Sequence, residues 1–192
     1  MSEKARKYRE GPIVACLILS GAIWLSAGCG GWAPVPDQSQ FAPLESLRDS
    51  GLAVVRLYAA PMPGLEGIAI HPWFVLKRAG SPDFDRWEVW PEVSDRLSRL
   101  AEDRYGHVYL NLAGPTAGAG VGGAHILAEL IGPEAEPVIA FIESRSPSYP
   151  SRHHYLYFPG PNSSTYAQWV LDCAGWDVTL PPTAIGKGIP PV

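Results

Sequence analysis

The stretch Phe158-Pro-Gly-Pro-Asn-Ser-Ser-Thr-Tyr-Ala-Gln-Trp-Val-Leu171 predicts a tight turn that leads directly into a helix. Asn162 and Ser163 come first on that helix, where backbone N–H groups lack partners within the helix and the helix dipole is positive. A polar side chain there can cap the helix by accepting a hydrogen bond from the first turn. The same position suits a nucleophile or a bound anion. The residues alone leave both interpretations open.

The spacing of Ser163, Tyr166 and Val170 places these residues on one face of the predicted helix. Tyr166, Trp169, Val170 and Cys173 form its apolar stripe. Ser163 is therefore expected to point toward the packed side of the helix, at the N-terminal edge of the stripe. In that position the N–H groups of the helix start could act as an oxyanion hole.

A catalytic serine needs a base, and His71 is the strongest candidate among the five histidines. His71 lies in a predicted strand beside Trp73. Glu88, on the neighbouring predicted strand, is expected to orient the imidazole by accepting its second N–H. His154 is the alternative base, because it lies on the segment that leads into the Ser163 helix.

The sequence assigns no metal and no cofactor. His153 and His154 point to opposite faces of a predicted strand, so they cannot share one metal ion without distortion. Gly118, Gly120 and Gly123 have the spacing of a dinucleotide-binding loop. The preceding predicted strand does not run directly into these glycines, however, and a flexible loop is the better interpretation.

Periodicity and turn residues predict a single α+β domain over residues 51–192, with an antiparallel sheet and packed helices. Strands are expected at residues 52–59, 67–77, 85–91, 107–112 and 152–158, with the second and third paired as a hairpin. Helices are expected at residues 92–105, 124–131, 133–144 and 162–174, and Gly175 is expected to end the last one.

The N-terminus predicts export and attachment to a membrane. A basic segment precedes an apolar run over residues 13–25, which is short for a membrane span and typical of a signal-peptide core. The run ends in Leu25-Ser-Ala-Gly-Cys29, which is similar to the bacterial lipoprotein signal in which the Cys is lipidated after cleavage. The alternative is an uncleaved anchor over residues 1–29 with an incidental Cys29. In both cases the protein is expected in the bacterial cell envelope.

Residues 30–50 are rich in Pro, Gln and Ser and are expected to form a flexible tether. Gly30, and not Asp, follows Cys29, so the outer membrane is a candidate destination. Only Cys173 remains in the mature domain, which excludes an internal disulfide there. The net charge of −4, with 18% charged residues, gives no indication of nucleic-acid binding.

Three segments resemble the bacterial family named domain of unknown function 3750, and together they cover most of residues 52–188. The family implies no established activity. It usually has Asn at the position of Ser164. The segments are His71-Pro-Trp-Phe-Val-Leu-Lys77 with Arg86-Trp-Glu-Val-Trp90, Pro159-Gly-Pro-Asn-Ser-Ser-Thr-Tyr166, and Leu180-Pro-Pro-Thr-Ala-Ile-Gly-Lys187.

More distantly, a His on an early strand and Asn-Ser at a late helix start are similar to circularly permuted papain-like proteins of the NlpC type. That group includes lipid acyltransferases, amidases and cell-wall peptidases. Its active members carry Asn-Cys, so the resemblance places Ser163 in the Cys slot and His71 at the catalytic His. It implies either a serine variant of the enzyme or a site that binds without cleaving.

Two functions are therefore expected of a membrane-tethered lipoprotein. One is hydrolysis or transfer of an acyl or amide group, with Ser163 as nucleophile, His71 as base and Glu88 as the orienting carboxylate. The other is a non-catalytic envelope binding module for a peptide, glycan or lipid. Asn162, Trp73 and His154 are the further residues expected to contact the ligand.

Overall fold

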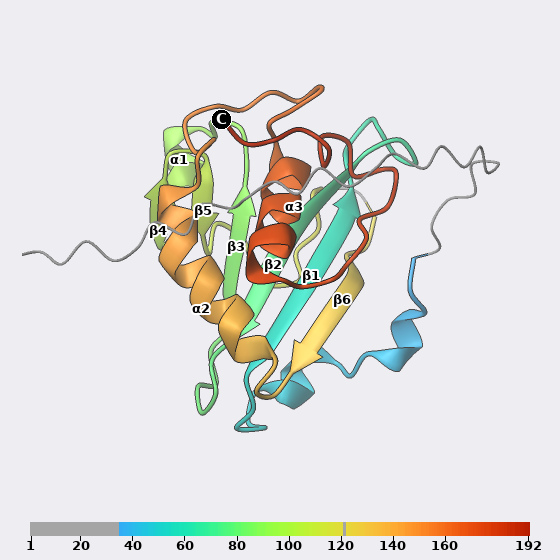
Figure 1. Ribbon diagram of the computed structural model, residues 1–192, viewed down its shortest axis with the longest axis vertical. Coiled ribbons are helices and arrows are strands. Elements are labelled where there is room, and N and C mark those ends of the chain that lie inside the picture. Colours follow the sequence, from blue (N-terminus) through green and yellow to red (C-terminus); the bar gives the residue numbers. More distant parts are fainter. Residues whose placement is uncertain (1–34, 121) are drawn as a thin grey trace, which may run out of the picture. The chain divides into compact units, whose positions relative to one another are not determined.

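The computed structural model of the protein describes residues 35–120 and 122–192, which belong to one compact unit. Six strands in these residues form a single sheet in the order β4-β5-β3-β2-β1-β6 (Figure 1), and every neighbouring pair is antiparallel. The predicted α+β class and the predicted hairpin of the second and third strands are confirmed. The strands are β1 (Val54–Pro61), β2 (Ile70–Lys77), β3 (Asp85–Val89), β4 (Asp103–Tyr105), β5 (Val108–Leu110) and β6 (His125–Ile131).

The two longer helices of the described chain lie on the same face of this sheet (Figure 1). The helices are α1 (Asp95–Ser98), α2 (Ala135–Arg145) and α3 (Ser163–Ala174), together with the short 3-10 helices η1 (Gln38–Gln40), η2 (Leu44–Leu47) and η3 (Ser146–Ser148). As expected, α3 ends at Gly175, which adopts a left-handed conformation with φ of 69°.

The two faces of the sheet carry separate sets of buried side chains, because alternate residues of a strand point in opposite directions. Phe74 and Leu76 of β2 belong to the main core, which includes residues of α2 and α3. Trp73 and Val75 of the same strand belong to a smaller cluster on the other face, together with Tyr58 of β1. Below, these are called the helix face and the far face.

Strand β6 lies where the sequence predicted a helix over residues 124–131, and that prediction was wrong. Ala, Leu and Glu in this stretch favour helices when considered alone. Tertiary contacts override the preference, since β6 pairs with β1 from Ile131 to His125 and Glu129 forms an ion pair with the buried Arg56. The Gln38 side chain also bonds both the N–H and the carbonyl of Ile126, at 2.8 and 3.1 Å.

Two further elements differ from the prediction. Residues 92–105, expected as one helix, contain only the single turn α1 and then the edge strand β4. Residues 152–158, expected as a strand, form turns and irregular backbone. The alternation of large side chains in the latter stretch therefore does not reflect pairing in the sheet.

Residues 35–50 fold onto the domain, although the sequence predicted a flexible tether over residues 30–50. Phe41 and Leu44 are half-buried against the far face of the sheet. The Arg56 guanidinium donates a hydrogen bond of 2.7 Å to the carbonyl of Ala42. The predicted signal or anchor over residues 1–29, including Cys29, lies outside the described residues.

Candidate functional site

His71 and Glu88 meet on the far face of the sheet, as the sequence predicted. His71 Nε2 and Glu88 Oε2 are 2.9 Å apart, and neither side chain is exposed to solvent. An ionised carboxylate can only accept, so His71 donates through Nε2 and its Nδ1 is the unprotonated nitrogen. Nδ1 is buried and has no hydrogen-bond partner among the described residues.

Glu88 is the centre of a larger buried network. Its Oε2 also accepts hydrogen bonds from Arg86 Nη2, at 2.7 Å, and from the Trp90 indole N–H. The Trp90 ring stacks on the His71 imidazole with centroids 4.0 Å apart, and the Arg86 guanidinium lies 4.1 Å from the ring centroid of Trp73. Three donors, from β2, from β3 and from Trp90 just after β3, therefore converge on one carboxylate oxygen.

Burial and charge set the protonation states of this pair. Burial lowers the pKa of the His71 imidazole below its ordinary value of 6.5, although the neighbouring Glu88 favours the charged form. Burial raises the pKa of the Glu88 carboxyl, but the hydrogen bonds and charges of His71 and Arg86 outweigh it and hold that pKa below the ordinary value. At neutral pH, His71 is neutral and Glu88 is a carboxylate paired with Arg86.

The glycine-rich loop that begins at Gly114 is fixed to this network. The indole N–H of Trp73 donates to the Pro115 carbonyl at 2.8 Å. Arg86 Nη1 donates to the carbonyls of Gly114 and Ala117, at 2.9 and 2.6 Å. Trp73 is fully buried by these contacts. The prediction that Trp73 contacts a ligand was therefore wrong, because both its ring and its N–H are engaged inside the protein.

At the other candidate position, Asn162 caps α3. Its Oδ1 accepts from the N–H groups of Ser164 and Thr165, at 2.9 and 3.3 Å. The Asn162 N–H donates in return to Thr165 Oγ1, which completes a capping box. Asn162 Nδ2 donates to the Tyr157 carbonyl at 3.2 Å. Asn162 is therefore confirmed as the N-cap of α3, whereas the Ser163 side chain takes no part in the cap.

Two of the resembling segments pack together at this cap. Gly186, with φ of 97°, lies so close to Asn162 that an added Cβ would be 2.7 Å from the side-chain amide. Thr165 Oγ1 donates to the Gly186 carbonyl at 2.8 Å. Gly160 approaches Thr165 in the same way, with 2.9 Å between an added Cβ and Oγ1. The two segments therefore form one structural unit around the start of α3.

Ser163 is 4% exposed and points inward, as predicted, where it lines a cavity of about 330 Å³. Its hydroxyl makes no hydrogen bond with any of the described residues. This hollow, the Ser163 cavity, has mostly apolar walls. It is lined by Met62, Leu65, Ile68, Ala69, Ile70, Tyr155, Tyr157, Phe158, Asn162, Ser163, Ser164 and Ile185.

The predicted pairing of Ser163 with His71 is not formed, because the two residues serve opposite faces of the sheet. α3 packs on the helix face, where Tyr166 meets Phe74 edge to face. His71 stacks on Trp73 and Trp90 on the far face. His71 does not line the Ser163 cavity. The serine therefore lacks the base that the sequence assigned to it.

His154, the alternative base, lies in the irregular segment before α3 and is exposed. It does not line the Ser163 cavity, and neither does His153. Within residues 35–120 and 122–192, no cluster of three or more His, Cys, Asp or Glu side chains is arranged to hold a metal ion. In the same part of the chain, no helix has the length and hydrophobicity to cross a membrane.

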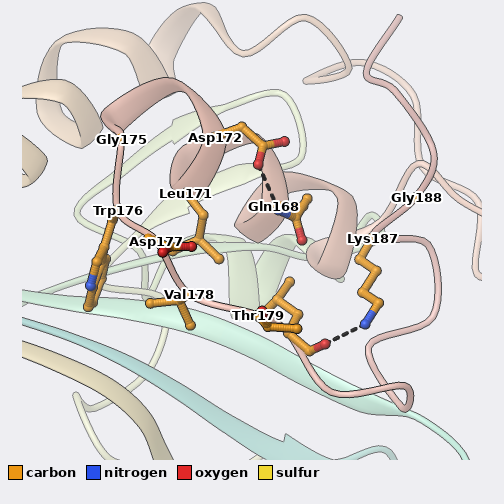
Figure 2. Close-up of a pocket in the computed structure, with 11 residues that line it drawn as sticks. Gln168, Leu171, Asp172, Gly175, Trp176, Asp177, Val178, Thr179, Lys187 and Gly188 are labelled. Atoms are coloured by element: carbon orange, nitrogen blue, oxygen red, sulfur yellow. Dashed lines mark hydrogen bonds between the residues drawn. The ribbon is translucent and has the colours of Figure 1, made fainter. Parts of the chain in front are cut away.

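A larger and more open hollow of about 590 Å³ lies at the C-terminal end of α3 (Figure 2). Three of its polar side chains are engaged with the protein: Asp172 accepts from Gln168, and the Lys187 ammonium donates to the carbonyls of Leu180 and Pro181. None of the residues predicted for the site lines it. Although this hollow is larger, the cationic side chain in its lining, Lys187, is bound to backbone carbonyls of the loop at Leu180. We therefore do not take it as the candidate site.

The sequence missed the residues at the mouth of the Ser163 cavity. Ile68 is 60% exposed, Tyr157 64% and Phe158 76%, and Leu65 is 43% exposed. Large apolar side chains that stay exposed together commonly mark a binding surface. The sequence did contain a signal, the apolar cluster Leu156-Tyr157-Phe158 just before the turn into α3. It was interpreted incorrectly as part of an alternating strand.

A family model described as "Protein of unknown function (DUF3750)" matches residues 52–189. Searches of curated proteins and of solved structures found no match. The match covers both the His71–Glu88 network and the cap of α3, and the resemblance to permuted papain-like proteins stays a prediction.

Proposed function

The chain belongs to the DUF3750 family of proteins of unknown function, and we propose that it is a membrane-tethered envelope protein that binds a ligand in the Ser163 cavity without cleaving it. One observation carries the proposal. The hydroxyl of Ser163, a residue that is only 4% exposed, lines an apolar cavity and has no hydrogen-bond partner among the described residues, while the candidate base, His71, lies on the other face of the sheet. A serine hydroxyl is a weak nucleophile unless an adjacent base activates it.

The surroundings of the cavity support a ligand-binding role. Small-molecule sites have mostly apolar walls and a few polar groups that fix orientation, with volumes of roughly 300–1,000 Å³. The Ser163 cavity has these properties and opens at exposed Ile68 and Phe158. Membrane attachment is supported by the apolar run and the lipoprotein-like sequence before Cys29, which lie outside the described residues.

The His71–Glu88 network has a structural role in this proposal. It is enclosed, and its donors fix the loop at Gly114 and the strands β2 and β3. Hydrogen bonds are stronger in such a buried site than in water, although His71 Nδ1, Arg86 Nε and Glu88 Oε1 have no partner among the described residues. Glu88 therefore links β2 and β3 on the face of the sheet opposite to α3.

The proposal is tested by trapping whatever occupies the cavity in cells that export the full chain. A photoreactive p-benzoylphenylalanine replaces Phe158, which is 76% exposed at the cavity mouth. The matched control places the same residue at Leu100, which is 63% exposed and does not line the cavity. We expect an adduct of defined mass at position 158, lost when Ala69→Trp fills the cavity. Equal adducts at both positions, or none at position 158, would refute ligand binding here.

A further inference from the structure

We infer that the ligand of the Ser163 cavity is an uncharged acyl ester or amide, whose hydrocarbon chain lies against the apolar walls and whose carbonyl oxygen accepts a hydrogen bond from Ser163 Oγ. This inference rests on the proposed function and specifies the class of ligand. It follows from which polar groups line the cavity and from which of them already form hydrogen bonds within the protein.

The side-chain amide of the cavity, that of Asn162, is already occupied. The side-chain oxygen of Asn162 accepts from two backbone N–H groups, and its Nδ2 donates to the Tyr157 carbonyl. Ser164 is 1% exposed and donates its N–H to the same cap. The hydroxyls of Ser163, Ser164 and Tyr155 line the cavity without a hydrogen bond to any described residue, and of these Ser163 occupies the first position of α3.

The few polar groups in this mostly apolar lining disfavour two of the ligand classes expected from the sequence. A glycan carries a hydroxyl on most carbons, and burying these without partners is costly. A peptide presents one N–H and one carbonyl per residue, and both require partners when buried. An acyl chain needs polar contact only at its carbonyl end, which one hydroxyl can supply.

The same lining disfavours an ionised head group. Among the described residues that line the cavity, none carries a charge. An unpaired carboxylate is far more costly to bury than a neutral carbonyl. A free fatty acid is therefore expected to bind less well than an ester of the same chain.

The mouth of the cavity fits entry from a lipid phase. Leu65, Ile68, Tyr157 and Phe158 line the cavity and are also exposed at the surface, from two separate loops. An exposed apolar rim that continues into an apolar cavity lets a hydrocarbon chain enter without crossing water. This arrangement favours an acyl chain that comes from a membrane lipid.

The experiment uses the full chain in lipid nanodiscs and four photoreactive probes: a dodecanoyl glycerol ester, dodecanoic acid, dodecane and an end-blocked apolar tripeptide. Labelling of the peptides that carry residues 62–70 and 155–164 is quantified by mass spectrometry. We expect the ester to label these peptides at least about ten-fold more than the acid at pH 8, because the acid is charged.

Variants test the roles of the hydroxyl and of the rim. Ser163→Ala should lower ester labelling about three- to ten-fold, the effect of one neutral hydrogen bond, and should leave dodecane labelling unchanged. Ile68→Ser changes a residue that is 60% exposed and should lower ester and dodecane labelling alike without unfolding the protein. Equal ester labelling in Ser163→Ala and wild type overturns the inference, as does acid labelling as strong as ester labelling.

The outcomes also separate this inference from the proposed function. If the tripeptide labels the cavity more than the ester, the ligand is a peptide, and the inference fails while the binding function stands. If no probe labels the cavity peptides above the level of Ala69→Trp, both fail.

Discussion

Replacing Glu88 by Leu should destabilise the protein strongly, because it leaves the buried Arg86 guanidinium without its carboxylate. Glu88 is unexposed and accepts from His71 Nε2 at 2.9 Å and from Arg86 Nη2 at 2.7 Å, as well as from Trp90. Removing one partner of a buried ion pair typically costs about 3–5 kcal/mol. For a domain of this size that corresponds to a decrease in melting temperature of roughly 6–20 °C.

Thermal and urea unfolding of the full chain, followed by circular dichroism, measure this effect. The double variant Glu88→Leu with Arg86→Met should recover much of the loss, because it leaves no unpaired buried charge. Glu92→Leu is the matched control, since the Glu92 side chain is 80% exposed, and it should change stability by less than about 0.5 kcal/mol. A loss below about 1 kcal/mol for Glu88→Leu, or a double variant no more stable than the single one, would refute the central role of Glu88.

Three further predictions concern the cap, a close approach and pH. Asn162→Ala removes the N-cap of α3 and should lower the free energy of unfolding by about 0.5–2 kcal/mol in urea titrations; no loss would argue against the cap. Gly186→Ala combines a positive φ with a Cβ 2.7 Å from Asn162, so it should cost at least about 2 kcal/mol. Gly188→Ala, with open space around it, should be near neutral, and equal losses for the two variants would contradict the packing. The pKa of His71 is lower in the folded than in the unfolded chain, so the unfolded chain binds the proton first, and stability should fall as pH drops below about 6.5. His71→Gln should flatten this dependence in urea titrations from pH 8 to pH 5, and an unchanged slope would show that His71 does not cause it.

The sequence predicted local features well where one residue type dictates one geometry. The Asn162 cap, the end of α3 at Gly175 and the inward direction of Ser163 are confirmed. The contact between His71 and Glu88 is also confirmed, because neighbouring antiparallel strands with matching side-chain direction bring such residues together.

Other features depend on contacts between residues that are far apart in the sequence. Residues 125–131 have helix-forming composition, but their pairing with β1 and the contact of Glu129 with Arg56 stabilise them as a strand. The alternating large side chains of residues 152–158 resembled a half-buried strand, but Tyr157 and Phe158 are exposed and line the Ser163 cavity.

The error at the candidate site has one physical cause. Alternation along β2 already places His71 on the same face of the sheet as Trp73, and Phe74 on the other face. The sequence does not state which of these two faces α3 covers, and the predicted dyad required the face of His71. α3 packs against Phe74 instead, which separates Ser163 from the imidazole.

The central claim is that the Ser163 cavity binds an acyl group independently of His71. The most direct measurement is photolabelling of the cavity peptides by the dodecanoyl ester in wild type, Ser163→Ala and His71→Gln, each shown to be folded by circular dichroism. We predict that His71→Gln is labelled as strongly as wild type, whereas labelling of Ser163→Ala falls about three- to ten-fold. An equal loss in both variants would contradict the claim, because it would mean that Ser163 and His71 act as one unit.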